Sequence, residues 1–294
     1  MTGRRHRLPT LVTLAVLAAA TSCALTRPDA GNVAAAPALV PFTAPESMAR
    51  LGRSRHRVDF FHLANEFESQ TTRTFCGPTS AAIVLNALRA DDARVEKPED
   101  PSLVPTGVRA SLPKGFDPLY HRYTQNDLFT PAAERVKTRN AVLGAPSARG
   151  TRPAPGLELR QLHELLGTAG VDSRLRVVDD ALPDATVRAE IVENLGTPDD
   201  YVIVNYSRAA LGQEGGGHIS PLGAYDEESD SFLILDVNPN GHRWVWAPAA
   251  ALIRAMRTRD TAENRGYLLV REGARSAGAA PQGGGATVGT KPPL

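Results

Sequence analysis

The sequence predicts an α+β fold, with helices in the first half of the chain and an antiparallel sheet in the second. Two observations lead to this class. Apolar residues surround the segment after Gly77-Pro78 on nearly all sides, which is typical of a helix buried in a core. Four later segments are short and rich in β-branched and aromatic residues, which is typical of strands. We therefore expect a buried helix followed by a sheet.

The chain begins with the layout of a secretory signal peptide over residues 1–23. Arginines precede the apolar run Leu11–Ala20, which is too short to cross a bilayer as a helix. Cys23 then follows small residues, so it is a candidate lipid-anchored cysteine, and plain cleavage after Ala20 is an equal alternative. Arg4-Arg5 gives a weak signal for twin-arginine export. We expect an exported protein, on the outer face of the cytoplasmic membrane, in the periplasm or outside the cell.

Composition divides the rest of the chain into three parts. Residues 24–45 are rich in Ala and Pro, and we expect a tether there. Residues 273–294 are rich in Gly, Ala and Pro, and we expect a disordered tail. Residues 46–272 lie between them and have a length that is usual for one domain.

Charge and cysteine content exclude several classes of function. The net charge is +1, and loss of the signal peptide leaves 30 basic and 32 acidic residues, so no basic stripe is available for nucleic acid. If Cys23 is lipidated or removed, Cys76 is the one cysteine left, and an intramolecular disulfide cannot form. Neither Cys-x-x-Cys nor His-Glu-x-x-His occurs, so we expect no metal site and no tightly bound cofactor.

The elements of the domain follow from periodicity. Residues 77–88 are the predicted buried helix, because Pro78 suits a first helical turn. Residues 157–169 repeat leucine at helical spacing and stop at Gly170, which predicts an amphipathic helix. Strands are predicted over 201–206, 219–225, 232–237 and 267–270. The polar turn 226–230 joins the second and third of these strands into an antiparallel hairpin.

Cys76 is the candidate nucleophile. It lies directly before the predicted buried helix, where free N–H groups and a partial positive charge stabilise a thiolate, the reactive form of cysteine. A small, inert, buried cysteine is the alternative reading of this position, and location alone gives the two readings even weight.

His218 and Asp236 are the candidate base and its orienting carboxylate. His218 opens a predicted strand after three glycines, and Asp236 ends the apolar strand that pairs with it. The mean of their residue numbers is 227, inside the connecting turn, so the two side chains should lie opposite or nearly opposite each other. A strand-edge histidine bonded to backbone and an acid that caps the next loop are the structural alternatives.

Gln70 lies six residues before Cys76, and its side-chain amide is a candidate donor to a developing oxyanion. The chain order Gln, Cys, His, Asp matches a papain-type site, in which cysteine attacks, histidine moves the proton and a third group orients the histidine.

The same residues carry a family resemblance that extends from about residue 60 to 270. The motifs resemble those of the phytochelatin synthase family and occur in family order: Phe67-Glu68-Ser69-Gln70, Phe75-Cys76-Gly77-Pro78-Thr79-Ser80, Val84-Leu85-Asn86-Ala87-Leu88, Tyr123-Thr124-Gln125-Asn126, Asn205-Tyr206-Ser207-Arg208, Gly217-His218-Ile219-Ser220-Pro221-Leu222, Phe232-Leu233-Ile234-Leu235-Asp236-Val237 and Arg265-Gly266-Tyr267. Each motif is short, but together they are highly specific.

The resemblance implies a papain-like fold and a glutathione γ-glutamylcysteinyltransferase. Cys76 would attack the amide between cysteine and glycine of glutathione, and γ-glutamylcysteine would pass to a second glutathione or to water. Asp260 and Arg265 match the family's γ-glutamyl-binding residues, although the loop between them is about two residues short. Arg208 and Gly217, within the matching motifs, complete the candidate substrate contacts.

Three departures keep alternatives open. The Cys-rich C-terminal domain of eukaryotic members is absent, which favours hydrolysis over transfer; the interval from Cys76 to His218 is enlarged; and export separates the enzyme from cytosolic thiols. An exported cysteine peptidase or amidase, and a non-catalytic anchored binding lipoprotein, are the competing readings. Cadmium or zinc would act through metal–thiolate complexes of the substrate, or would inhibit by binding Cys76. The expected partners are glutathione or a related γ-glutamyl thiol peptide, a membrane only through Cys23, and a second copy in a homodimer.

Overall fold

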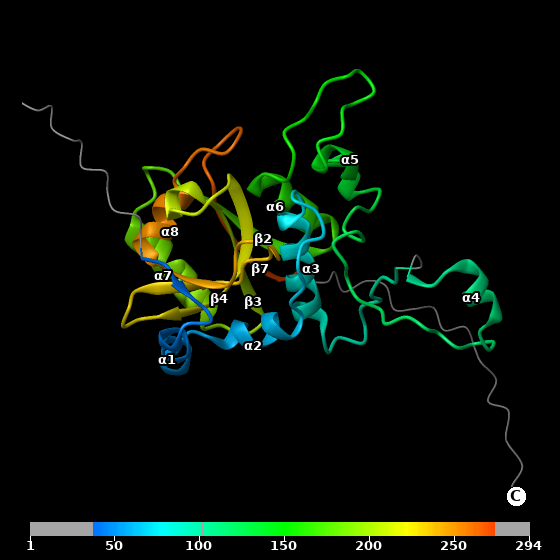
Figure 1. Cartoon of the computed structure of the whole chain (residues 1–294), viewed down its shortest axis with the longest axis horizontal. Helices are drawn as coiled ribbons and strands as arrows, with labels where there is room; N and C mark the ends of the chain where they lie inside the picture. Colours follow the sequence, from blue (N-terminus) through cyan, green and yellow to red (C-terminus); the bar gives the residue numbers. More distant parts are fainter. Residues whose placement is uncertain (1–37, 101–102, 274–294) are drawn as a thin grey trace, which may run out of the picture. The chain divides into compact units, whose positions relative to one another are not determined.

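A seven-stranded antiparallel sheet forms the centre of the fold (Figure 1). The computed structural model describes residues 38–100 and 103–273, so the expected signal peptide and nearly all of the expected tail lie outside the described residues. Within these ranges the strand order is β1-β6-β5-β4-β3-β7-β2. The strands are β1 (Val40–Pro41), β2 (Val171–Val177), β3 (Asp200–Ser207), β4 (Gly217–Asp226), β5 (Ser231–Ile234), β6 (Val245–Pro248) and β7 (Gly266–Glu272).

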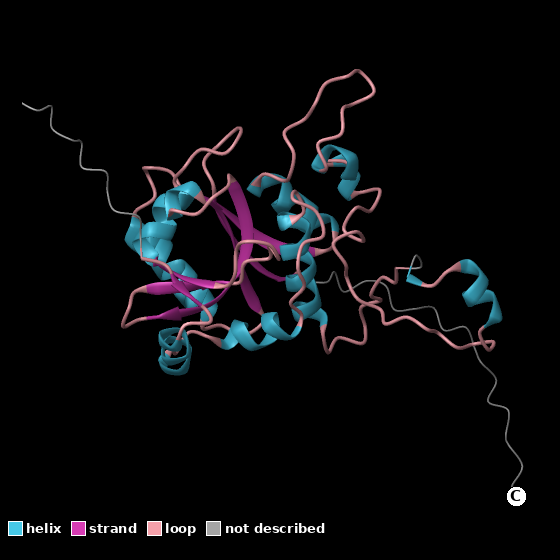
Figure 2. Cartoon of the chain, in the orientation of Figure 1, coloured by secondary structure: helices cyan, strands magenta, loops and turns pink. Residues whose placement is uncertain are grey.

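Helices cover both faces of this sheet, as Figure 2 shows. They are α1 (Pro45–Arg53), α2 (Val58–Asn65), α3 (Cys76–Arg89), α4 (Thr106–Ser111), α5 (Arg139–Val142), α6 (Leu159–Thr168), α7 (Asp184–Leu195) and α8 (Ala249–Met256), with short 3₁₀ turns η2 (Ala133–Arg135) and η3 (Ala209–Leu211). The predicted α+β class, with a buried nucleophile helix and a C-terminal antiparallel sheet, is confirmed.

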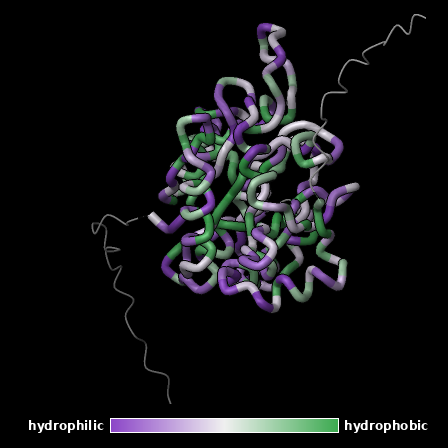
Figure 3. Tube along the Cα trace, turned by 90° about the vertical axis from the view of Figure 1, so that its left-hand side faces the viewer, coloured by the Kyte–Doolittle hydropathy of each residue, from purple (hydrophilic) through white to green (hydrophobic). Residues whose placement is uncertain are grey.

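Two hydrophobic clusters lie on opposite faces of the sheet because side chains alternate along each strand. On β3, Tyr201 and Ile203 join the cluster that contains α3 and α6, whereas Val202 and Val204 join the cluster that contains α7 and α8. In Figure 3 the hydrophobic stretches of the chain accordingly gather toward the centre of the molecule, with many hydrophilic stretches around them. The sheet is thus buried on both faces, and α3 packs against one of them.

The predicted elements are found with small shifts. The buried helix is α3, the amphipathic helix is α6, and the four predicted strands are β3, β4, β5 and β7. The third of these is shorter than expected, since β5 ends at Ile234 and leaves Asp236 outside the strand. Helices α7 and α8 and strands β2 and β6 were not predicted, because their sequences are less uniformly apolar or too short.

The folded region begins earlier than the expected boundary at residue 46. Val40 pairs with Trp246 and Pro41 with Val245, so β1 adds an edge strand from within the segment expected to be a tether. Pro45 then occupies the first turn of α1. No helix in the described ranges combines the length and apolarity needed to cross a membrane.

Candidate active site

Cys76 is the first residue of α3, at the end of the helix where backbone N–H groups are unpaired. The Ser80 hydroxyl donates to the Cys76 carbonyl over 2.8 Å and lies 3.2 Å from the Ile219 carbonyl, which ties this helix end to β4. Burial alone would raise the pKa of the Cys76 thiol, but a hydrogen bond with His218 and the charge of that imidazole lower it overall. The site therefore favours a thiolate.

His218 lies at the start of β4, and its two ring nitrogens face different partners. Nε2 lies 3.0 Å from Asp236 Oδ1 and 2.9 Å from Ser220 Oγ, so Nδ1 is the nitrogen left for Cys76. Burial lowers the pKa of His218, but the Asp236 hydrogen bond and the Cys76 thiolate raise it overall. Cysteine and histidine thus stabilise each other as an ion pair.

The hairpin brings His218 and Asp236 together, although not in the expected register. Leu222 pairs with Ile234 and Ala224 with Leu233, with an irregularity between them. Directly opposed partners therefore have number sums two to three higher than the sequence suggested. Asp236 reaches the imidazole diagonally, from the segment just after β5, where Leu235 N still donates to the Pro221 carbonyl over 2.9 Å.

His218 is not the only partner of Asp236 in the described part of the chain. Arg208 Nη1 lies 2.7 Å from Asp236 Oδ2, and Nη2 donates to Oδ1 over 2.9 Å. The Tyr206 hydroxyl donates to Oδ2 over 3.3 Å, and Asn238 N donates to Oδ1 over 2.9 Å. Burial raises the pKa of Asp236, yet the hydrogen bonds and charges of His218 and Arg208 hold it far below its usual range. The carboxylate stays ionised.

The geometry gives Arg208 a different place from the one expected. Its side chain is 4 % exposed, and its guanidinium is engaged by Asp236 and by Gln213 Oε1 at 3.1 Å. A guanidinium that is already paired in this way is not free to bind a substrate carboxylate. The contact that the structure shows for Arg208 is with the orienting acid, and a direct contact with substrate stays a prediction.

Gln70 lines the site, and its side-chain amide is partly engaged by a hydrogen bond within its own loop. Its backbone N donates to the Val237 carbonyl over 2.9 Å, which fixes it beside the segment after Asp236. Side-chain Nε2 donates one hydrogen to the Thr72 carbonyl over 2.7 Å. Because an amide nitrogen carries two hydrogens, one remains for an oxyanion. The oxyanion role of Gln70 stays a prediction.

Asp260 and Arg265 contact each other, and Arg265 lies beside Gly217. Arg265 Nη2 donates to Asp260 Oδ1 over 3.1 Å, and Asn205 Nδ2 donates to Asp260 Oδ2 over 2.8 Å. A Cβ atom on Gly217 would meet Arg265 Nη2 at 2.9 Å, so only glycine leaves room for the guanidinium there. Sequence reasoning missed the role of Asn205, whose position opposite Gly266 could not be read without the β3–β7 register.

A pocket of about 570 Å³ opens beside His218. Gln70, Arg208 and Gly217 also line it, with further walls from Thr71, Thr72, Arg73, Glu214, Gly215, Gly216, Asn238, Pro239, Asn240 and His242. Three of the five candidate substrate and oxyanion residues thus share one cavity with the candidate base, whereas Asp260 and Arg265 are not among its lining residues.

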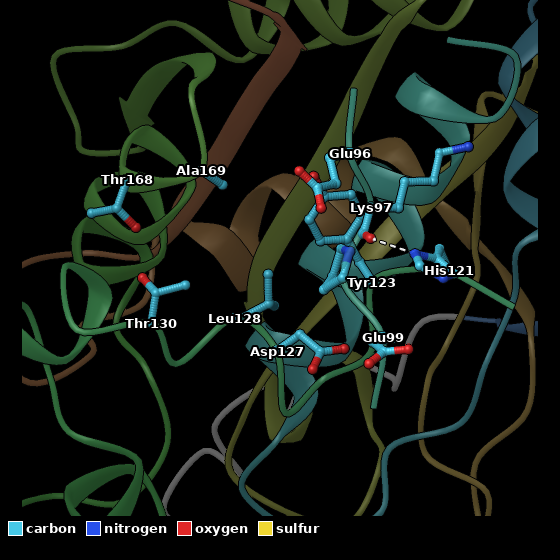
Figure 4. Close-up of a pocket in the computed structure, with 11 residues that line it drawn as sticks. Glu96, Lys97, Glu99, His121, Tyr123, Asp127, Leu128, Thr130, Thr168 and Ala169 are labelled. Atoms are coloured by element: carbon cyan, nitrogen blue, oxygen red, sulfur yellow. Dashed lines mark hydrogen bonds between the residues drawn. The ribbon is translucent and has the colours of Figure 1, made fainter. Parts of the chain in front are cut away.

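A separate pocket of about 600 Å³ contains none of the candidate catalytic residues (Figure 4). Glu99 and His121 line it, and together with Asp117 they form a group whose ligand atoms lie within 4.8 Å of one another. His121 Nε2 lies 2.7 Å from Asp117 Oδ2, and both side chains are exposed, so a surface ion pair accounts for the contact. Sequence reasoning, which expected no metal site, did not find this group.

Known proteins resemble this chain along most of its length. The sequence model of the phytochelatin synthase family, described as "Phytochelatin synthase", matches residues 31–100 and 117–267. "Glutathione gamma-glutamylcysteinyltransferase 3" of Lotus japonicus is 27% identical over 81% of this chain and 43% of its own length. The corresponding Triticum aestivum enzyme 1 is 29% identical over 72% of this chain and 35% of its own. The chain therefore spans less than half the length of these relatives.

The solved structure of xylellain, a cysteine protease from Xylella fastidiosa, matches 82% of this chain and 88% of its own with 13% identity and a TM-score of 0.34. This likeness is too distant to locate any residue. The family match covers three quarters of the sequence, including Cys76, His218 and Asp236. This chain belongs to the phytochelatin synthase family.

Proposed function

We propose that this protein is a glutathione γ-glutamylcysteinyltransferase that acts through a thioester on Cys76. The observation that carries the proposal is the continuous link from Cys76 through His218 to Asp236, beside an open pocket. The names of the curated relatives support glutathione as the substrate.

In the first half of the reaction, the Cys76 thiolate attacks the carbonyl carbon of the cysteine–glycine amide. The negative charge that develops on the carbonyl oxygen meets the Cys76 backbone N–H at the helix start and the remaining Gln70 hydrogen. His218, protonated in the ion pair, gives its proton to the amide nitrogen. The C–N bond then breaks, glycine leaves as an amine, and a γ-glutamylcysteinyl thioester remains on sulfur.

In the second half, His218 takes a proton from the incoming nucleophile. An amine of a second glutathione yields a longer peptide, and water yields free γ-glutamylcysteine. The C–S bond breaks and the thiolate returns. We infer that hydrolysis is the stronger of the two outcomes, and that cadmium or zinc enters as a thiolate complex of glutathione rather than as a resident ion.

The acyl half of the substrate fits the side of the site that holds Asp260 and Arg265. A γ-glutamyl group carries an α-ammonium and an α-carboxylate, which complement an aspartate and an arginine. The Arg265 side chain lies against Gly217, the neighbour of His218, and holds Asp260 through a hydrogen bond, which supports contact with the acyl group during attack. We also propose that the protein is exported, which separation of the cell envelope from the cytosol would test.

The test is incubation of the purified protein with glutathione, with and without cadmium, followed by mass spectrometry of the products. We expect wild-type protein to release glycine and γ-glutamylcysteine, and Cys76→Ser protein to release neither. Longer γ-glutamylcysteine oligomers among the products would show that the enzyme also transfers the acyl group to a second glutathione. If no Cys76-dependent product forms under either condition, glutathione is not the substrate, and a different peptide or amide must be sought.

A further inference from the structure

The pocket of about 570 Å³ begins at Gly217, beside Arg265, and extends past His218 to the segment that follows Asp236. On one side, β4 pairs with β3, and β3 pairs with β7, which Arg265 directly precedes. On the other side, β4 pairs with β5, and the chain continues through Asp236 into the far wall of the pocket, which is formed by Asn238, Pro239, Asn240 and His242. If the acyl group occupies the Arg265 side, the leaving residue must occupy the far part of the pocket, where residues 70–73 lie beside the segment that follows Asp236.

That pocket contains one arginine that has no partner. The Arg208 guanidinium is taken by Asp236. Arg73 also lines the pocket, three residues before the nucleophile, and its exposed guanidinium makes no hydrogen bond or ion pair within the described part of the chain. Glu214 and His242 are the other titratable groups on the rim, besides His218.

The chemistry of both half-reactions places a carboxylate in this pocket. The leaving glycine has a carboxylate one carbon from the nitrogen that departs. The attacking α-amine of a second γ-glutamyl peptide also has a carboxylate one carbon from its nitrogen. Leaving group and acceptor therefore present the same arrangement of amine and carboxylate to the same side of His218. An arginine is the side chain best suited to bind such a carboxylate with two hydrogen bonds.

We propose that Arg73 binds the α-carboxylate of the residue that leaves Cys76 and of the residue that accepts the acyl group. This inference rests on the proposed function for the identity of the substrate, and it adds the determinant of specificity on the leaving-group side. Arg73 makes no contact with Asp236 or His218, so its effect should fall on substrate binding and leave the reactivity of the thiol unchanged.

The first experiment compares glutathione with its C-terminal amide, which lacks the carboxylate charge. Binding is measured by calorimetry on Cys76→Ser protein, so that no acyl transfer occurs. We expect glutathione to bind about tenfold more tightly than the amide, and Arg73→Gln to reduce this ratio to about one. Arg243→Gln is the matched control, because Arg243 follows the same loop but donates to the Pro239 carbonyl and lines another pocket. Unequal binding that survives in Arg73→Gln would overturn the inference.

A second experiment does not depend on glutathione. Cys76 is alkylated with 3-bromopropionate and with 3-bromopropionamide, and the ratio of the two rates is compared between variants. We expect Arg73→Gln to lower the acid-to-amide ratio severalfold without changing the rate with the amide, and Arg243→Gln to leave the ratio unchanged. An unchanged ratio in Arg73→Gln overturns the inference. Failure of glutathione to bind at all, with a lowered alkylation ratio, would overturn only the proposed substrate.

Discussion

Arg208 and Asp236 form a buried ion pair with two contacts, Nη1 at 2.7 Å from Oδ2 and Nη2 at 2.9 Å from Oδ1. The site thereby becomes a row of four alternating charges: the Cys76 thiolate, the His218 imidazolium, the Asp236 carboxylate and the Arg208 guanidinium. Such a row is neutral overall, which limits the cost of burying it. Arg208 thus opposes part of the influence of Asp236 on the imidazole.

Removal of the Arg208 charge should move the pH profile upward. A neutral side chain such as that of Arg208→Met withdraws a positive charge, so the pKa values of Cys76 and His218 should both rise. We expect both limbs of the kcat/KM profile to shift to higher pH by about half to one unit, with a loss of about tenfold or more at the optimum. Arg208→Lys should restore part of the activity and most of the profile. A fall in activity with unshifted limbs would mean that Arg208 serves only packing.

Gly217→Ala should weaken substrate binding more than turnover. The new methyl group would displace the Arg265 guanidinium from its position at 2.9 Å, while His218 keeps its contact with Asp236. We expect KM for glutathione to rise about tenfold with a smaller change in kcat. Gly216→Ala is the control, because nothing lies within 4 Å of its Cβ position. If Gly217→Ala and Gly216→Ala change KM equally, Arg265 does not bind the γ-glutamyl group.

Gln70→Leu should lower kcat and leave KM nearly unchanged, because an oxyanion donor acts on the transition state. Loss of one such donor costs about 100-fold in known enzymes. The Tm of the variant must be compared with that of the wild type, since Gln70 Nε2 also donates to the Thr72 carbonyl. A normal kcat in a stable variant would assign the oxyanion to other donors.

Asp59 should make the protein less stable as pH rises. Its side chain is fully buried, both carboxylate oxygens lack partners, and burial with the nearby charges of Asp200 and Asp199 raises its pKa to about 9. The folded protein therefore holds a proton that the unfolded chain loses near the ordinary value of 3.8, and stability falls between these two values as pH increases.

Asp59→Asn should remove this dependence. We expect the variant to gain Tm relative to the wild type at pH 8 and to gain little or nothing at pH 4, as followed by thermal unfolding at both values. Asp180→Asn is the control, since the Asp180 side chain is fully exposed. A constant difference between Asp59→Asn and wild type across this range would show that Asp59 does not titrate with folding.

The sequence predicted the reactive groups because their chemistry and their local structure coincide. Cys76 could be assigned to a helix start from Gly77-Pro78, and the separation of His218 and Asp236 follows from a hairpin with a short polar turn. The prediction tolerated an error in register, since an aspartate just beyond the strand end can still reach the imidazole diagonally.

Contacts that depend on loop conformation could not be predicted from periodicity and motifs. Arg208 meets Asp236 because the chain from Ser207 to Gly216 folds back on itself, with Arg208 N donating to the Gly216 carbonyl over 3.0 Å, and no periodicity signals that turn. The burial of Asp59 likewise depends on how α2 packs against the sheet. The early edge strand β1 was missed because two residues carry no detectable strand pattern.

The most direct test of the central claim is intact-mass measurement of the protein after brief incubation with glutathione and acid quenching. We predict a population of wild-type protein heavier by one γ-glutamylcysteinyl group, held as a hydroxylamine-sensitive thioester at Cys76. His218→Ala protein should form it far more slowly, and Cys76→Ser protein should not form that thioester. Glycine release by wild-type protein without any acyl group on Cys76, or with the group on another residue, would contradict the account.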